Sequence, residues 1–89
     1  MPVVKLRAPL RERAGGGAEH QVPGETVGEV IRALEARHPP VKGWILDEQG
    51  RVRAHVNVFV NGERSTADTP VAAAEELLVL PSISGGARR

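Results

Sequence analysis

The stretch TVGEVIRALEARHPP, from Thr26 to Pro40, decides how the rest of this chain can fold. Four apolar residues in it recur at the i, i+3, i+4 and i+7 spacing of an amphipathic helix: Val27, Val30, Ile31 and Leu34. Thr26 followed by Glu29 forms a capping box at the start. Pro39 ends the helix because the residue before a proline is forced out of helical conformations. We therefore predict a helix at about residues 26–38 with an apolar stripe that must be buried.

The segment before the helix predicts two strands. Residues 2–10, PVVKLRAPL, alternate apolar and charged side chains with the period of a half-buried strand. The expected inner face carries Val4, Leu6 and Ala8, and the outer face carries Lys5 and Arg7. Gly15 to Gly17 then predict a hairpin loop, and residues 18–22, AEHQV, predict the return strand.

The segment after the helix predicts further strands. Residues 55–63, HVNVFVNGE, alternate strictly and end in Asn61-Gly62, a strong signal for a tight turn. One face carries Val56, Val58 and Val60, and the other carries His55, Asn57 and Phe59. A final strand is predicted at residues 77–83, LLVLPSI. Its inner face carries Leu77 and Val79, and its outer face carries Leu78 and Leu80.

The order of these elements defines the fold class. It runs strand, strand, helix, strand, a short strand and a last strand. A single amphipathic helix can bury its stripe only by lying across one face of a sheet. We predict an α+β fold of the β-grasp, ubiquitin-like type over residues 1–84. It would consist of a mixed sheet of four to five strands packed on one main helix.

The composition excludes several functions. The 12 basic and 11 acidic residues balance to a net charge of +1, which argues against nucleic-acid or membrane partners. With no cysteine, the chain can form no disulfide, thiolate metal site or cysteine nucleophile. No apolar run is long enough for a membrane span or a signal peptide. We expect a soluble, cytoplasmic protein.

Side chains that could perform chemistry are scattered. His20, His38 and His55 lie 17 or 18 positions apart with no carboxylate cluster beside them, so we interpret them as surface or strand-face residues. Ser82 and Ser84 have no neighbouring base and are interpreted as spacers. We predict no metal site, no bound cofactor and no catalytic side chain.

An apolar group on the outer face of the sheet is a candidate partner surface. Its members would be Phe59, Leu78 and Leu80, and exposed apolar patches mark interaction sites. Two alternatives remain open. A one-residue slip of register would move the three side chains into the core. Residues 39–50 could also cover them. In the overlapping stretch 41–54, VKGWILDEQGRVRA, we expect a short turn of helix and a loop around Gly50.

The C-terminal end resembles an extended arm. Pro81 lacks an N–H group, so sheet pairing should fade there. The six residues of the arm are Pro81, Ser82, Ile83, Ser84, Gly85 and Gly86, with an extended reach of about 20 Å. Such an arm can enter a narrow active site of another protein, and glycine adds no side chain at its end. The alternative is a frayed terminus without function.

Four segments together carry a resemblance to a known family. They are LRERAGG (10–16), VPGETVGEVIRALEARHP (22–39), HVNVFVNGE (55–63) and LLVLPSISGG (77–86). Over nearly its whole length the chain resembles the sulfur-carrier branch of the ubiquitin-like superfamily, the MoaD/ThiS type, and is most similar to CysO-type carriers. One departure is the turn before the last strand, where such carriers often have Gly-Asp and this chain has Ala74-Glu75-Glu76.

The resemblance implies a defined chemistry at Gly86. An ATP-dependent activating enzyme would adenylate the carboxylate of Gly86, and sulfur would displace AMP to give a thiocarboxylate. A synthase, cysteine-synthase-like by the resemblance, would then accept the sulfur. The carrier would be a protein co-substrate that binds no cofactor, and its patch at Phe59, Leu78 and Leu80 would dock the partners.

The last three residues depart from the carrier pattern. Ala87, Arg88 and Arg89 follow the diglycine, so Gly86 has no free carboxylate in the chain as written. The resemblance implies a precursor cut between Gly86 and Ala87 by a JAMM-type metalloprotease. A cloning remnant, or a chain that never carries sulfur, are the alternatives. Two further functions also stay open: a protein modifier conjugated through Gly86, and a non-covalent ubiquitin-like binding module.

Overall fold

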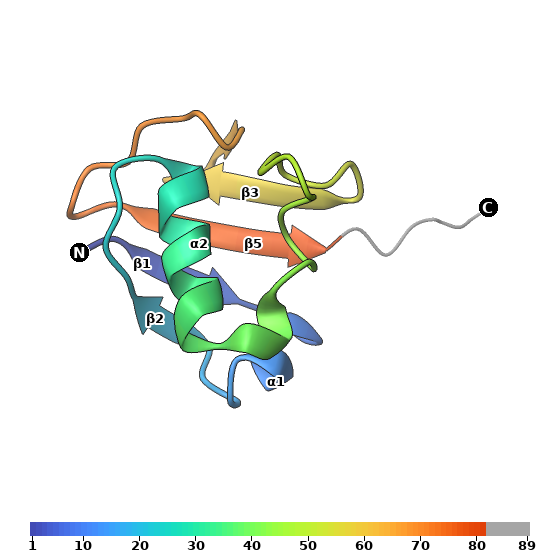
Figure 1. The fold of residues 1–89 in the computed structure, drawn as a ribbon. Coiled ribbons are helices and arrows are strands. Elements are labelled where there is room, and N and C mark those ends of the chain that lie inside the picture. Colours follow the sequence, from blue (N-terminus) through green and yellow to red (C-terminus); the bar gives the residue numbers. More distant parts are fainter. Residues whose placement is uncertain (82–89) are drawn as a thin grey trace.

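A computed structural model that describes residues 1–81 shows a mixed sheet of five strands with one long helix across one face (Figure 1). The strands are β1 (Val3–Leu6), β2 (Glu19–Gln21), β3 (Val56–Val60), β4 (Glu63–Ser65) and β5 (Glu76–Pro81), in the order β2-β1-β5-β3-β4. Strands β1 and β5 pair in parallel, and the other neighbours pair antiparallel. The predicted β-grasp architecture is therefore confirmed.

The long helix α2 (Val27–Arg37) forms where the apolar spacing predicts it. The Thr26 side-chain oxygen accepts the Glu29 N–H at 3.2 Å, and the Glu29 carboxylate accepts the Glu25 N–H at 3.0 Å. These bonds satisfy N–H groups that have no partner within the helix. All four residues of the apolar stripe are fully buried against the sheet.

The connection between β1 and β2 corrects the predicted glycine hairpin. The chain leaves the sheet after Leu6, so Ala8 is exposed and not part of the inner face, and a short helix α1 (Leu10–Arg13) follows. The cause is the burial of Leu10 and Ala14, which lie four positions apart and pull this segment onto the core. The spacing of these two residues was the signal for the helix.

The glycines after α1 cap this helix. Gly15 has a φ of +80°, and its N–H donates to the Glu12 carbonyl at 3.3 Å. The Gly16 N–H donates to the Arg11 carbonyl at 2.9 Å. This pair of bonds is a Schellman motif, which needs a left-handed residue immediately after the helix and therefore favours glycine there.

The segment after α2 completes the core on the helix side. The short 3-10 helix η1 (Pro39–Val41) lies before most of the stretch 41–54 in which a helical turn was predicted, and the following loop buries Ile45 and Leu46 together with Val41. Its turn is held by the Asp47 carboxylate, which accepts the N–H groups of Gln49 and Arg51, each at 2.9 Å.

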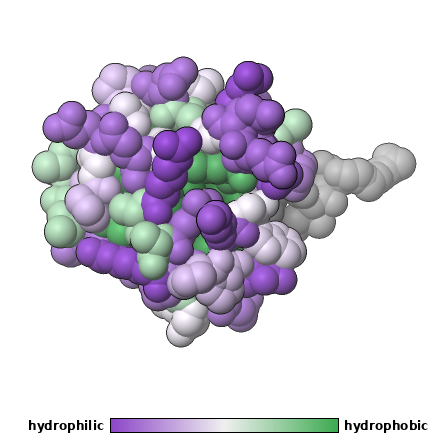
Figure 2. Space-filling model, in the orientation of Figure 1, coloured by the Kyte–Doolittle hydropathy of each residue, from purple (hydrophilic) through white to green (hydrophobic). Residues whose placement is uncertain are grey.

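Hydrophilic residues predominate on the visible surface of the helix-bearing face (Figure 2). Among the described residues, no helix has the length and apolar character needed to cross a membrane.

Candidate docking face and the root of the arm

The pairing of β3 with β5 determines which side chains face away from α2. Phe59 lies opposite Leu78, and Asn57 lies opposite Leu80. Their chain neighbours Val58 and Val79 are fully buried, whereas Phe59, Leu78 and Leu80 are half-buried. The structure thus places the three predicted patch residues together on the helix-free face. The segment 39–50 cannot cover them because its buried residues join the core on the other face.

This docking face is a shallow hollow of about 490 Å³. Its lining residues are Lys5, Arg7, Phe59, Asn61, Gly62, Glu76, Leu78 and Leu80. The Lys5 ammonium lies 3.3 Å from the Glu76 carboxylate and 4.0 Å from that of Glu19. The face therefore combines an apolar floor with charged margins, an arrangement typical of protein interfaces.

The strand that leads to the arm occupies the centre of the sheet. Strand β5 lies between β1 and β3, and its last residue, Pro81, pairs with Val56. On the other side, Val79 pairs with Leu6 of β1. The sheet therefore holds the root of the predicted arm from both sides. The predicted residues Ser82 to Gly86, and the processing bond between Gly86 and Ala87, lie outside the described residues.

The turn before β5 replaces the Gly-Asp of similar carriers with a side-chain network. The Glu75 carboxylate accepts the Ala72 N–H at 2.7 Å and the Asn61 amide N–H at 2.8 Å. The Asn61 side-chain oxygen accepts the Glu76 N–H at 3.2 Å. Asn61 also occupies the β3–β4 turn with a φ of +50°, followed by Gly62 at +86°, as the predicted tight turn requires. One residue thus connects this turn to the start of β5.

The histidines do not assemble into a metal site. His20 and His38 are half-buried and contact each other edge to face, with ring centroids 4.8 Å apart. Nε2 of His20 lies 2.9 Å from the Gly17 carbonyl oxygen. His55 is exposed at the start of β3. Within residues 1–81, no group of three or more potential ligands could hold a metal ion. Sequence spacing gave no signal for the His20–His38 contact. The two residues lie 18 positions apart, and they meet only because α2 packs across the sheet with its last turn near β2.

A second hollow, of about 390 Å³, lies between α2 and the following loop. Its charged lining residues are Arg32, Glu35, Lys42, Asp47, Glu48 and Arg53. Burial raises the pKa of Glu35, and the Gly43 N–H, Lys42 and Arg32 only partly offset this effect. The pKa of Asp47 is lowered, chiefly by its hydrogen bond from the Arg51 N–H. The hollow is thus lined by three basic and three acidic side chains.

The sheet order, the single crossing helix and the open apolar face define a ubiquitin-like β-grasp protein. The chain belongs to the ThiS family, whose model matches residues 4–86. This family match confirms the predicted relation to the MoaD/ThiS sulfur carriers and ends at the second glycine of the diglycine.

Individual relatives cover almost the whole chain. Small archaeal modifier protein 1 of Haloferax volcanii is 37% identical over 84 residues, which are 92% of this chain and 97% of that protein. The sulfur carrier protein CysO of Mycobacterium tuberculosis is 29% identical over 89 residues, with 93% and 96% covered. A crystal structure of the Amycolatopsis orientalis BexX/CysO complex matches with a TM-score of 0.88 at 29% identity. It covers 97% of this chain and all of the matched chain.

Proposed function

We propose that this protein carries sulfur as a thiocarboxylate on Gly86 and delivers it in the biosynthesis of cysteine or a related sulfur metabolite. The observation that carries the proposal is the ThiS family match, which extends from β1 through the diglycine and stops at Gly86. Similarity to sulfur carrier proteins named CysO supports the role in cysteine synthesis.

The proposed chemistry proceeds at the backbone terminus. A carboxylate at neutral pH is a poor electrophile, so an activating enzyme joins the Gly86 carboxylate to AMP from ATP and releases pyrophosphate. A sulfur nucleophile then attacks the acyl carbon, the bond to the phosphate oxygen breaks, and AMP leaves. With hydrogen sulfide as this nucleophile, loss of its proton leaves the thiocarboxylate, and the step needs no oxidant or reductant. This carrier supplies no catalytic side chain, which agrees with a chain that has no cysteine.

The docking face has a separate task in this scheme. Phe59, Leu78 and Leu80 would contact the activating enzyme and the synthase while the arm reaches their active sites. The central position of β5 supports this division, because a rigid strand fixes where the arm starts relative to the face. The sheet thus fixes the position of Pro81, the root of the arm, relative to the docking face.

Maturation must come first under this proposal. Ala87, Arg88 and Arg89 lie beyond the family match and convert the Gly86 carboxylate into an amide. A metalloprotease of the JAMM type would hydrolyse the Gly86–Ala87 bond and expose the carboxylate.

A second function is supported by one relative. The 37% identical protein is named a small archaeal modifier, so conjugation of Gly86 to lysines of other proteins is the alternative. Both functions begin with the same acyl-adenylate and differ in the nucleophile, sulfur or a lysine amine. A purely non-covalent binding module is the third candidate, and it needs no reactive terminus.

Mass spectrometry of the protein from its native cells separates these functions. A carrier should end at Gly86 and show the mass gain expected when one carboxylate oxygen is replaced by sulfur. A modifier should instead appear as branched peptides that join Gly86 to lysine side chains. A population that keeps Ala87 to Arg89 throughout, with neither product, would contradict both and favour the non-covalent module.

A further inference from the structure

Arginines gather at the end of the domain where β5 terminates. Strand β1 runs parallel to β5 with Leu6 beside Val79, so the residues that follow β1 lie next to the root of the arm. This segment carries the exposed residues Arg7, Arg11 and Arg13. Arg53 lies there too, since its carbonyl accepts the N–H of Val56, the residue that pairs with Pro81. We call these four arginines the basic collar.

An exposed tryptophan stands within the collar. Trp44 is 42% exposed, and only Met1 is also an exposed large apolar side chain in the described part of the chain. The Arg13 guanidinium lies 3.8 Å from the centroid of the Trp44 ring. Nε of Arg53 donates to the carbonyl of Gly43, the residue before Trp44, at 2.6 Å. The ring therefore has one arginine stacked on it and a second anchored beside it.

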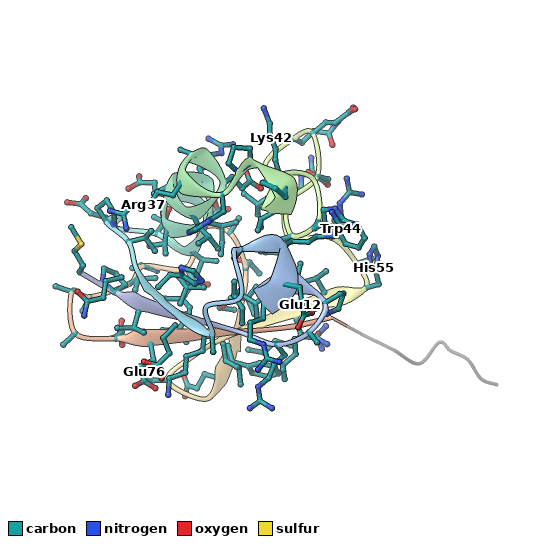
Figure 3. All side chains as sticks on the ribbon, turned by 90° about the horizontal axis from the view of Figure 1, so that it is seen from below. Glu12, Arg37, Lys42, Trp44, His55 and Glu76 are labelled. Carbon is teal, nitrogen blue, oxygen red and sulfur yellow. The ribbon has the colours of Figure 1, made fainter. Side chains whose placement is uncertain are left out.

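The collar occupies one pole of the molecule. Figure 3 shows Trp44 and His55 close together at the end where β3 begins, with Glu76 toward the opposite end. Glu12 lies 3.5 Å from Arg11, and Asp47 accepts two backbone N–H groups. Arg53 also lines hollows that contain the carboxylates of Glu35, Asp47, Glu48 and Asp68, so Arg7, Arg11 and Arg13 supply most of the collar's positive charge. At the far pole, the start of β5 and the turn into β4 carry Glu63, Glu75 and Glu76, with Lys5 beside Glu76. At that pole Lys5, Arg64 and the N-terminal ammonium accompany the carboxylates, so the excess of positive charge is a property of the collar end alone.

We propose that the basic collar and Trp44 form a second docking surface, which binds a ring of carboxylates around the active-site entrance of a protein partner. This inference rests on the proposed function, since a partner that receives the arm must approach the end from which the arm starts. The local excess of arginines would orient the end that carries the root of the arm toward an acidic partner during encounter. Tryptophan and arginine are also the residues that contribute most to binding at protein interfaces.

A protein is the partner that this surface fits. Single-stranded nucleic acids bind proteins through successive aromatic rings. This chain has one Trp, one Phe and no Tyr, and Phe59 lies on the docking face of the sheet and not at the collar. A carboxylate rim needs only the arginines and one apolar contact.

The single tryptophan allows a direct test. The form that ends at Gly86, labelled with 5-fluorotryptophan, has one fluorine signal, from Trp44. The activating enzyme encoded in the same genome should shift or broaden this signal, and added salt should weaken the effect. Arg13→Gln should weaken binding about tenfold, and Arg13→Lys should restore most of the affinity because it keeps the charge. Arg37→Gln is the matched control, since Arg37 is exposed and lies far from Trp44 (Figure 3).

The outcomes separate this inference from the proposed function. If the enzyme binds but neither moves the Trp44 signal nor distinguishes Arg13→Gln from Arg37→Gln, the inference is wrong and the carrier function stands. If the unsubstituted form that ends at Gly86 does not bind the enzyme, the carrier function fails, and a glutamate-rich peptide then tests the collar alone. A peptide without effect on the Trp44 signal would overturn the inference. An oligonucleotide that shifts the Trp44 signal at a lower concentration than the peptide would also overturn the inference.

Discussion

Phe59 and Leu78 lie directly opposite each other across the β3–β5 pair, half-buried on the face that carries no helix. Side chains paired in this way contact each other across the strands. Their immediate neighbours Val58 and Val79, which are also paired, are fully buried on the other face. One strand pair thus supplies both the core and the docking face.

This alternation predicts opposite outcomes for two adjacent leucines. Leu77→Ala removes a fully buried side chain and should lower the free energy of unfolding by about 2–5 kcal/mol. Leu78→Ala should lower it by about 1 kcal/mol or less, as for most substitutions outside the core. Chemical denaturation of both variants measures the difference, and equal losses would contradict the assignment of faces.

Phe59→Ala should separate folding from binding. We expect a small loss of stability, and a loss of about 2 kcal/mol or more in binding the activating enzyme or the synthase if Phe59 is a central contact. Calorimetric titration against each partner measures the second quantity. Unchanged affinity for both partners would remove Phe59 from the docking surface, and an unfolded variant would place it in the core.

The length of the chain should decide whether it can be activated. A form that ends at Gly86 has a free carboxylate there, whereas the 89-residue form has an amide. With ATP and the activating enzyme, only the shorter form should give an acyl-adenylate at Gly86. Pyrophosphate release measures the reaction, and equal release by both forms would exclude the precursor role.

Gly86→Ala, in the form that ends at residue 86, should abolish most sulfur transfer. The added methyl group crowds the reacting carbonyl and a channel shaped for glycine. Single-turnover transfer, measured beside the unsubstituted form, gives the effect. Arg37→Gln in the same form serves as the control on a distant surface. Equal rates for the substituted and unsubstituted forms would mean that the diglycine is not the reactive end.

Two substitutions of Asn61 should lower the stability of the fold by different amounts. Asn61→Ala loses the side-chain bonds to Glu75 and Glu76 and places a Cβ in a left-handed backbone conformation. Asn61→Gly loses the same bonds but tolerates that conformation. The alanine variant should therefore be less stable by about 1 kcal/mol than the glycine variant. Urea unfolding compares them, and equal stability would mean that backbone strain contributes nothing at this turn.

Glu35 predicts a specific pH dependence. Burial raises the pKa of Glu35 in the folded state above its ordinary value of 4.5, so the folded chain holds this proton to a higher pH than the unfolded chain does. The contribution to stability is present below pH 4.5 and is lost as the pH rises through the raised pKa. Glu35→Gln should therefore gain stability relative to wild type as the pH increases through this range.

The contribution of Asp47 to stability should change with pH in the opposite direction to that of Glu35. Its pKa is lowered, so its contribution is present above the ordinary value and is lost as the pH falls through the lowered pKa. Asp47→Asn should thus lose stability relative to wild type at neutral pH and approach it in acid. Parallel pH slopes for the Glu35 and Asp47 variants would contradict both assignments.

The sequence by itself determined the elements whose signals lie within a few residues. The spacing of four apolar residues and the Thr26–Glu29 capping box predicted α2 to within a residue at each end. Strict alternation predicted which side chains of β3 and β5 are buried, and Asn61-Gly62 predicted the turn into β4. These features depend on local periodicity and backbone conformation, which a short stretch of sequence contains in full.

Only the tertiary structure decided which distant segments meet. Strands β1 and β2 pair antiparallel as predicted, but the burial of Leu10 placed the helix α1 in the connection where only a glycine loop was expected. This helix brought Arg13 onto Trp44. The order of the strands set the end of β1 beside the end of β5, which gathered the basic collar around the root of the arm. The net charge of the chain does not reveal that these arginines lie together. Their positions depend on the parallel pairing of β1 with β5, two strands that lie about 70 residues apart in the chain.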